Sequence, residues 1–141
     1  MLSDDSEDVQ LAVANAGGIE AMLQLCKEGS PEAQKHATGA LVNLASSETN
    51  GNKDTMMTST AVNDLLALVN KSTSAEAQCN SVQTLRHLIS KNRENQDVVV
   101  KAGGFKSFVR LLSTSSMETR EQAAGILLDF VWSSSSNKQM M

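Results

Sequence analysis

The sequence predicts an all-α protein, an α-solenoid of about three repeats that each contain one short and two longer helices. Two observations lead to this prediction. The stretch AGGIEAMLQL at residues 16–25 returns as AGGFKSFVRL at residues 102–111, and STAVNDLLAL at residues 59–68 lies halfway between them. Aromatic residues make up only 3% of the chain, so the core must use aliphatic side chains and methionine, which suits packed helices.

Each repeat is predicted to open with a short helix. The three segments are EDVQLAVAN at residues 7–15, NKDTMMTS at residues 52–59 and NQDVVVKA at residues 95–102. Glycine pairs at residues 17–18 and 103–104 follow the first and the third segment, and glycine allows the backbone to turn sharply into the next helix. Thr60 and Ala61 occupy these positions in the second repeat, where the turn signal is weaker.

The repeated stretch itself is predicted to be the second helix of each unit. Its apolar residues recur at i, i+3, i+4 and i+7, which places them on one face of a helix. We expect the aligned positions to be buried in all three units, namely Ile19, Val62 and Phe105, then Met22, Leu65 and Phe108, then Leu23, Leu66 and Val109, then Cys26, Val69 and Leu112.

A longer third helix is predicted from Pro31, Ser74 and Ser116. Ser30 with Pro31 is a start signal, and residues 73–76 and 115–118 both fit a capping box. The apolar columns expected to bury this helix are Ala37, Ser81 and Ala123, then Leu41, Leu85 and Leu127, then Leu44, Leu88 and Phe130.

The string AGGIEAMLQLCKEGSPEAQKHATGALVNLAS resembles an armadillo repeat, with its glycine turn and a third helix ending in ALxNL. A period of 42 to 44 residues is typical of this family. The resemblance implies a right-handed superhelix, with one domain over residues 1–141 and repeats at about 7–50, 51–92 and 93–135.

The last residues, 136–141, resemble the start of the second short helix, so we interpret them as the beginning of a fourth repeat or, alternatively, as a frayed polar tail. An uncapped repeat end exposes apolar residues. We therefore expect either that the natural polypeptide continues or that this end docks against another chain, including end-to-end self-association. The candidate exposed residues are Phe130, Val131, Trp132, Met140 and Met141.

Composition argues against several classes of function. Four acidic residues at positions 4–8 supply the net charge of −4, and no basic stripe for nucleic acid remains. No apolar run is long enough to insert in a membrane. The two cysteines, 26 and 79, have no metal-ligand spacing and indicate reduced thiols, hence an intracellular protein of the cytoplasm or nucleus. We expect no cofactor, no metal and no catalysis, because Cys26 lies in a core column and Cys79 is two helical turns from His87.

The resemblance implies a peptide-binding surface along the concave side of the third helices. Families such as importin alpha and beta-catenin use an asparagine late in this helix to bond the main chain of an extended peptide. Asn43 stands at that position here, with His87 and Asp129 in the same column. The predicted partner is a protein segment, and the partner-binding residues are Asn43, His36, Asn80, Gln83, Arg86, His87, Gln122 and Asp129.

Two features qualify this surface. Importin alpha has a tryptophan one turn before the asparagine, whereas this chain has Gly39, Gln83 and Gly125, which argues against a receptor for nuclear localisation signals. Glycine in mid-helix usually has a packing or access reason. Two alternatives stay open: the polar residues simply face solvent, or the chain is an interior segment of a larger scaffold, such as a U-box protein, whose binding site lies elsewhere.

Overall fold

The computed structural model describes residues 2–46, 51–57, 60–114 and 116–140, and it describes side-chain contacts between residues 8 and 132. These residues form helices and no strand, which confirms the all-α class. The helices are α1 (Leu2–Asn15), α2 (Gly18–Glu28), α3 (Pro31–Ser46), α4 (Asn52–Met57), α5 (Ala61–Lys71), α6 (Ala75–Ile89), α7 (Arg93–Lys101), α8 (Gly104–Leu111) and α9 (Met117–Met140).

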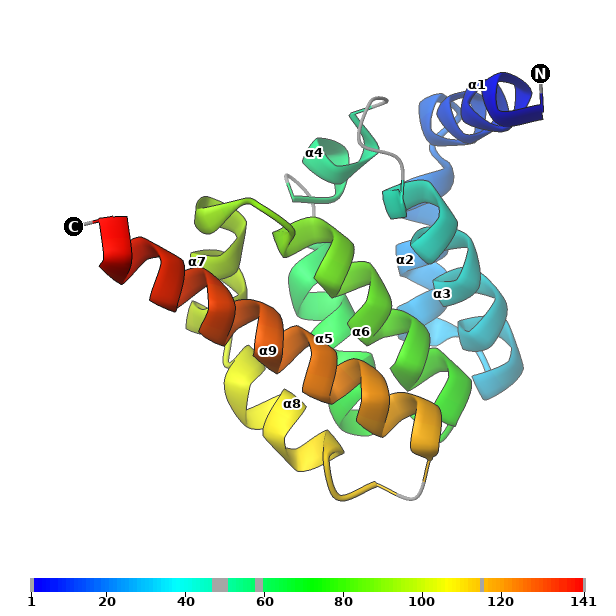
Figure 1. Ribbon diagram of the computed structural model, residues 1–141. Helices are drawn as coiled ribbons and strands as arrows, with labels where there is room; N and C mark the ends of the chain where they lie inside the picture. The colour runs from blue at the N-terminus through cyan, green and yellow to red at the C-terminus, as the bar shows by residue number, and fades with distance from the viewer. Residues whose placement is uncertain (1, 47–50, 58–59, 115, 141) are drawn as a thin grey trace.

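The helices are arranged as three stacked triplets (Figure 1). The long helices α3, α6 and α9 lie side by side, and α2, α5 and α8 form the layer behind them. The short helices α1, α4 and α7 open the triplets. The chain is therefore an α-solenoid, and α6 packs between α3 and α9.

The turns between the first two helices follow the predicted glycines. Gly17 has φ 86° and Gly103 has φ 91°, both in the left-handed region that glycine adopts without strain. The second repeat turns differently, because Thr60 stands there with φ −88°. The weaker turn signal in the second repeat thus corresponds to a different backbone conformation.

Serine side chains start the third helices. The backbone N–H of Ala33 donates to Ser30 Oγ at 3.2 Å, as predicted. In the second repeat the cap is Ser74, whose Oγ accepts from Ala77 N at 3.1 Å, so the capping box predicted from Thr73 was wrong by one residue. Ser116 Oγ accepts from Thr119 N at 3.3 Å in the third repeat, while Ser115 lies outside the described residues.

The second helices carry two apolar columns rather than one. The front column consists of Ile19, Leu23 and Cys26, of Val62, Leu66 and Val69, and of Phe105, Val109 and Leu112. The rear column consists of Gly18, Met22 and Leu25, of Ala61, Leu65 and Leu68, and of Gly104, Phe108 and Leu111. In the middle helix α5 both columns are buried, at 6% exposure or less.

The end helices bury one column each. In α2 the front column is buried and Leu25 of the rear column is 45% exposed. In α8 the rear column is buried, whereas Phe105, Val109 and Leu112 are 43%, 55% and 41% exposed. The predicted burial of these three residues was therefore wrong. The front column faces the following repeat, and no repeat follows α8 within the described residues.

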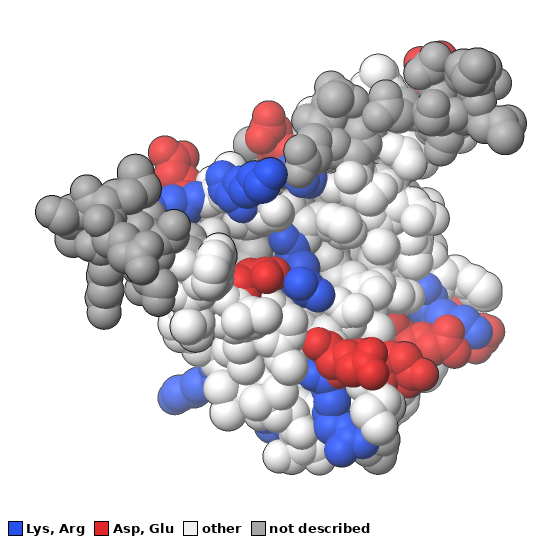
Figure 2. Space-filling model, in the orientation of Figure 1, with Lys and Arg blue, Asp and Glu red and all other residues white. Residues whose placement is uncertain are grey.

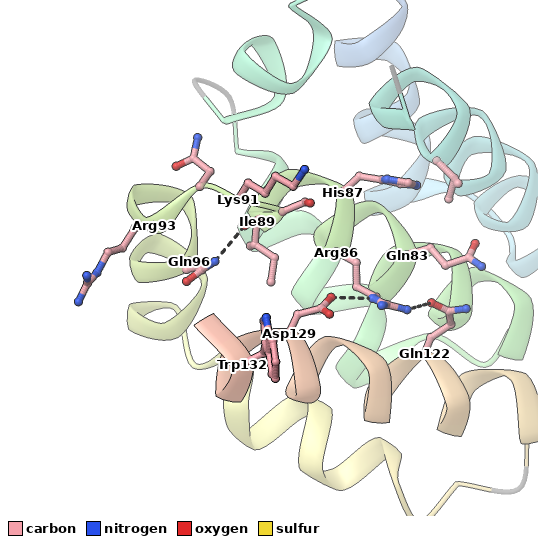
Figure 3. A pocket seen from close by; sticks show the side chains of 13 residues that line it. Gln83, Arg86, His87, Ile89, Lys91, Arg93, Gln96, Gln122, Asp129 and Trp132 are labelled. Atoms are coloured by element: carbon pink, nitrogen blue, oxygen red, sulfur yellow. Dashed lines mark hydrogen bonds and ion pairs between the residues drawn. The ribbon is translucent and has the colours of Figure 1, made fainter. Parts of the chain in front are cut away.

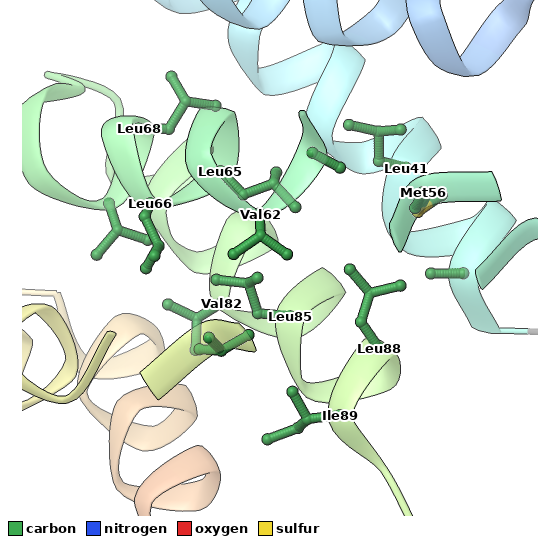
Figure 4. Packing of buried hydrophobic residues seen from close by; sticks show 14 of the residues in the cluster. Leu41, Met56, Val62, Leu65, Leu66, Leu68, Val82, Leu85, Leu88 and Ile89 are labelled. Carbon is green, nitrogen blue, oxygen red and sulfur yellow. The ribbon is translucent and has the colours of Figure 1, made fainter. Parts of the chain in front are cut away.

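The third helices supply most of the remaining core (Figure 4), and the short helices add Met56 from α4 and Val99 from α7. All predicted columns are buried except that Leu127 is only partly buried. Phe130 is only 8% exposed, so the prediction that it lies at an exposed end was wrong. Its ring makes a T-shaped contact with the ring of Phe105, with 4.9 Å between the centroids. The predicted exposure of Val131 and Trp132 is confirmed, and the side chains of Met140 and Met141 lie outside the described residues.

The helix α9 continues without a break through residues 136–140, where the start of a fourth repeat was predicted. The repeat boundaries and the interpretation of this end as a fourth repeat stay predictions.

Polar contacts recur at equivalent places in successive repeats. Asn52 Nδ2 donates to Leu44 O at 3.2 Å, and Asn95 Nδ2 donates to Leu88 O at 2.7 Å, so α4 and α7 each satisfy a carbonyl near the end of the preceding third helix. Within repeats, Gln34 Nε2 donates to Cys26 O and Gln78 Nε2 donates to Val69 O, both at 3.2 Å. The equivalent residue of the third repeat is Arg120.

Candidate functional site

An open pocket of about 860 Å³ lies where the C-terminal parts of α6 and α9 meet the connection from α6 to α7 (Figure 3). Its position follows from the fold, because α6 and α9 lie side by side and α7 begins directly after α6. Its lining includes polar side chains, charged side chains and one aromatic ring, contributed by Val42, Gln83, Arg86, His87, Ile89, Ser90, Lys91, Asn92, Arg93, Gln96, Gln122, Asp129 and Trp132.

Arg86 bridges the two long helices at the centre of this pocket. Its Nε donates to Asp129 Oδ2 at 3.0 Å and its Nη1 donates to Gln122 Oε1 at 3.2 Å, as the dashed lines in Figure 3 show. The two ion-pair partners are 35% and 40% exposed, so solvent screens the pair and its contribution to stability is modest. The bridge fixes the guanidinium in one place.

Gly125 explains how the Arg86 side chain fits against α9. A Cβ atom at this position would lie 2.6 Å from Arg86 Nη1 and 2.8 Å from its Cζ. The glycine therefore has a packing reason, which is to leave room for the guanidinium. Gly39 on α3 is different, because a Cβ there would meet only Asn80 Nδ2 at 3.7 Å, an ordinary contact.

The structure brings together five of the eight predicted partner-binding residues, and these line the pocket: Gln83, Arg86, His87, Gln122 and Asp129. Asn80 instead ties α6 to α3, since its Nδ2 donates to Thr38 Oγ1 at 3.2 Å and to Lys35 O at 3.4 Å. Asn43 and His36 are exposed on α3 and do not line the pocket. His36 Nε2 lies 3.7 Å from Glu32 on its own helix.

Sequence reasoning missed the residues that the α6–α7 connection and the end of α9 contribute. Lys91 and Arg93 precede the short helix predicted at residues 95–102 and Gln96 lies within it, and none of the three was assigned a role in binding. Trp132 was assigned to the exposed chain end and not to the binding surface, and it is 73% exposed. The one signal that could have found this group is that the only tryptophan of the chain lies one turn after Asp129.

Charged side chains gather in a few places on this face (Figure 2). Cationic and anionic side chains lie together near its centre, and a band of acidic and basic side chains lies toward its lower right. Residues other than Lys, Arg, Asp and Glu cover most of the surface between these two places.

The cysteines offer no reactive thiol at this site. Burial, and secondarily the charge of Asp64, raises the pKa of Cys26 to about 11. Burial also raises the pKa of Cys79, with Glu118 as the next contribution. Cys26 is 3% exposed, which confirms its predicted burial, while Cys79 is half-buried.

The described residues contain no cluster of three His, Cys, Asp or Glu side chains that could hold a metal ion. Among the same residues, no helix is both long and apolar enough to cross a membrane.

The comparison with known families matches this architecture. Residues 1–46 and 92–128, more than half of the chain, match the model of the armadillo/beta-catenin-like repeat. The chain therefore belongs to the armadillo repeat family, a class of α-solenoid protein-binding scaffolds.

Individual relatives share this repeat. The rice (Oryza sativa subsp. japonica) importin subunit alpha-1b is 28% identical over 110 residues, which cover 78% of this chain and 21% of the importin. The chain thus spans about a fifth of the length of this relative. Two crystal structures of engineered proteins are similar, one with a TM-score of 0.79, 30% identity and coverage of 86% of this chain and 29% of its own. The other has a TM-score of 0.77 and 28% identity, and the match covers 89% of this chain and 53% of the engineered protein.

Proposed function

We propose that this chain is a protein-binding module that holds an extended segment of a partner protein along the face formed by α3, α6 and α9. The observation that supports this proposal best is the open pocket between α6 and α9, which places donors and acceptors from both helices beside an exposed tryptophan. Membership of the armadillo family and the likeness to an importin alpha subunit support protein binding in general.

The chemistry of the face suits a peptide main chain. An extended segment presents alternating C=O and N–H groups, and a carboxamide can donate to one and accept from the other. Gln83 and Gln122 supply such groups in the pocket, and Asn43 supplies one on the exposed surface of α3. Since tryptophan is absent at positions 39, 83 and 125, binding of a nuclear localisation signal is not part of this proposal.

The proposal assigns no catalysis and no cofactor to the chain, and it places the protein inside the cell, in the cytoplasm or nucleus. The importin alpha relative supports this location. The alternative is a structural segment of a larger scaffold, with the binding site outside this chain.

Affinity capture followed by calorimetry tests the proposal. Partners are captured from a cell lysate, and peptides from them are titrated into the parent chain and into an Asn43→Ala, Gln83→Ala double variant. Neither side chain bridges to another helix, so the variant should fold. We expect binding to weaken by about tenfold or more, the equivalent of roughly 1.4 kcal/mol.

The control is Asn63→Ala, which removes an exposed carboxamide from α5. It should leave the affinity within about twofold of the parent. If the double variant and the parent bind all captured proteins equally well, the face of α3, α6 and α9 is not the binding surface, and the scaffold alternative gains support.

The exposed front column of α8 favours a second candidate function, self-association. The equivalent residues of α2 and α5 are buried in a stack where α2 contacts α5 and α5 contacts α8, whereas Leu25 in the rear column of α2 is 45% exposed. We propose that a second copy docks its α2 rear column on Phe105, Val109 and Leu112. Such a head-to-tail contact is heterologous, so it should produce open chains of increasing length.

Sedimentation over a range of protein concentrations tests this contact. We expect the average mass to rise with concentration, and Val109→Lys to abolish the rise. Val9→Lys changes a similarly exposed valine on α1 and should leave the rise in average mass unchanged. A parent chain that stays monomeric at every concentration would contradict self-association and leave the peptide-binding proposal intact.

A further inference from the structure

The pocket between α6, α7 and α9 has a charge opposite to that of the chain. The whole protein carries a net charge of −4. By contrast, Arg86, Lys91 and Arg93 line the pocket together with a single carboxylate, Asp129. That carboxylate is already neutralised, because Arg86 Nε lies 3.0 Å from its Oδ2. Because the guanidinium of Arg93 points away from the pocket (Figure 3), the charge left uncompensated inside it is the positive charge of Lys91, on a protein that is acidic as a whole.

Arg86 is held ready to bind a further acceptor. A guanidinium has five N–H groups, and the bonds to Asp129 and Gln122 use two of them. Because Gly125 has no Cβ, the guanidinium packs directly against α9. The remaining donors thus sit on a side chain that loses little freedom when a ligand binds.

Lys91 has an unusual backbone conformation. Its φ is 56°, which makes it the one residue other than glycine with a positive φ among the described residues. Glycine and asparagine adopt this region more readily than lysine does. The backbone therefore does not favour lysine here, which directs attention to a role for its side chain.

The side chains around the pocket point in different directions (Figure 3). Lys91 extends toward His87, on the side of the pocket formed by α6, whereas the guanidinium of Arg93 points away from the pocket. Within the described residues, no carboxylate makes an ion pair with Lys91. Trp132 stands at the opposite wall, on α9, with its ring largely exposed.

We propose that this pocket binds an acidic residue of the partner segment, its carboxylate held by Arg86 and Lys91, with an adjacent apolar side chain packed on Trp132. This inference rests on the proposed peptide-binding function and names the class of partner, a segment that contains aspartate or glutamate next to an apolar residue. A lysine-rich segment is disfavoured, because it would bring like charges together in the pocket.

A peptide array in matched pairs tests the proposal. Each acidic peptide, with an apolar residue beside Asp or Glu, is paired with a peptide that has Asn or Gln instead, so that only the charge differs. We expect the parent chain to bind the acidic members about three- to tenfold more tightly, as charge-assisted hydrogen bonds in a partly exposed site allow.

Three variants locate the effect. Lys91→Gln should reduce the preference for acidic peptides by about threefold or more, and Lys91→Arg should retain it. Lys101→Gln removes the same charge from the other end of α7, outside the pocket, and should leave the preference unchanged. Trp132→Ala should weaken binding of both members of a pair and leave their ratio unaltered.

Each remaining outcome decides against the proposal in a distinct way. Peptides that bind the parent chain without discrimination between acid and amide would overturn the inference and leave the peptide-binding function standing. An equal loss of preference in Lys91→Gln and Lys101→Gln would show a general charge effect, which also overturns the inference. If no peptide of the array binds, both the inference and the proposed function fail.

Discussion

The second and third repeats carry the same apolar pattern and bury it differently. In α5 both columns are buried, with Leu65 and Leu66 at 0% and 4% exposure. In α8 the rear column is equally buried, with Phe108 at 0%, but Val109 of the front column is 55% exposed. In a repeat protein each unit contacts only its neighbours, so a neighbour decides which column is covered.

The two repeats differ also in one polar contact. Gln78 of the second repeat donates to Val69 O and to Ser72 O, which ties the start of α6 to the end of α5. The equivalent Arg120 in the third repeat has a buried Nε with no hydrogen-bond partner in the described part of the chain. The third repeat therefore lacks a contact that the first two share.

The largest expected difference between the repeats concerns the front column. Val69→Ala should lower the free energy of unfolding by about 2 to 3 kcal/mol, because it removes buried methyl groups and leaves a cavity. Val109→Ala makes the same chemical change at an exposed position and should cost less than about 0.5 kcal/mol. Urea denaturation of both variants measures the difference. Equal losses would mean that the α8 column is covered in solution.

A smaller difference is expected between the two mid-helix glycines. Gly39→Ala should stabilise the fold by about 1 kcal/mol, since alanine favours helix and the added Cβ meets only ordinary contacts. Gly125→Ala gains the same helix propensity but displaces the Arg86 guanidinium, so the net change should be near zero. Thermal and urea unfolding of both variants measure this. An equal gain in stability for both variants would show that the Arg86 guanidinium does not need the space that Gly125 leaves.

Arg120→Gln should increase the free energy of unfolding by about 0.5 to 1 kcal/mol, because a glutamine can make the contact that Gln34 and Gln78 make. The control is Arg93→Gln, an arginine exposed at the start of α7, which should have no effect on stability. A decrease for Arg120→Gln would indicate that the arginine stem contributes more packing than the missing hydrogen bond costs.

The smallest effect on stability concerns thiols in the front column. Their rate of alkylation reports directly how exposed each position is. A Leu112→Cys variant should react with iodoacetamide much faster than Cys26, whose pKa burial raises from its ordinary 9.0 to about 11. Between about pH 9 and pH 11 the folded state keeps the proton of the Cys26 thiol, whereas the unfolded state loses it. The contribution of Cys26 to stability should therefore fall as the pH rises from about 9 to 11. Mass spectrometry of labelled peptides ranks the two sites, and equal rates would contradict the exposure of Leu112.

Much of the fold could be predicted from the sequence, because a period of about 43 residues repeats the helix signals three times. The glycine turns at Gly17 and Gly103 and the cap at Ser30 depend on local chemistry, and they were predicted correctly. The sequence did not predict the exposure of Phe105, Val109 and Leu112. A column of aligned apolar residues does not tell whether a neighbouring repeat covers it. The capping box at Thr73 failed because Ser74 offers an equally good hydroxyl one residue later.

The candidate site was predictable only in part. The columns along the third helices that the armadillo resemblance implies identified Gln83, Gln122 and Asp129, and Arg86 was added because it lies beside them. The bridge from Arg86 to Asp129 depends on how closely α6 and α9 approach, and the sequence alone does not state this distance. Lys91 belongs to an irregular connection with a positive φ, so no helical periodicity could place it.

The position of Trp132 gives the protein a built-in optical reporter. The chain contains one tryptophan and no tyrosine, so nearly all of its emission excited at 295 nm, roughly the usual wavelength for indole, comes from a single ring at the edge of the pocket. That ring is 73% exposed to water in the unbound protein. A segment that packs against the ring must exclude water from the indole and shift its emission to shorter wavelength. Binding in the pocket can therefore be followed by fluorescence without any attached dye.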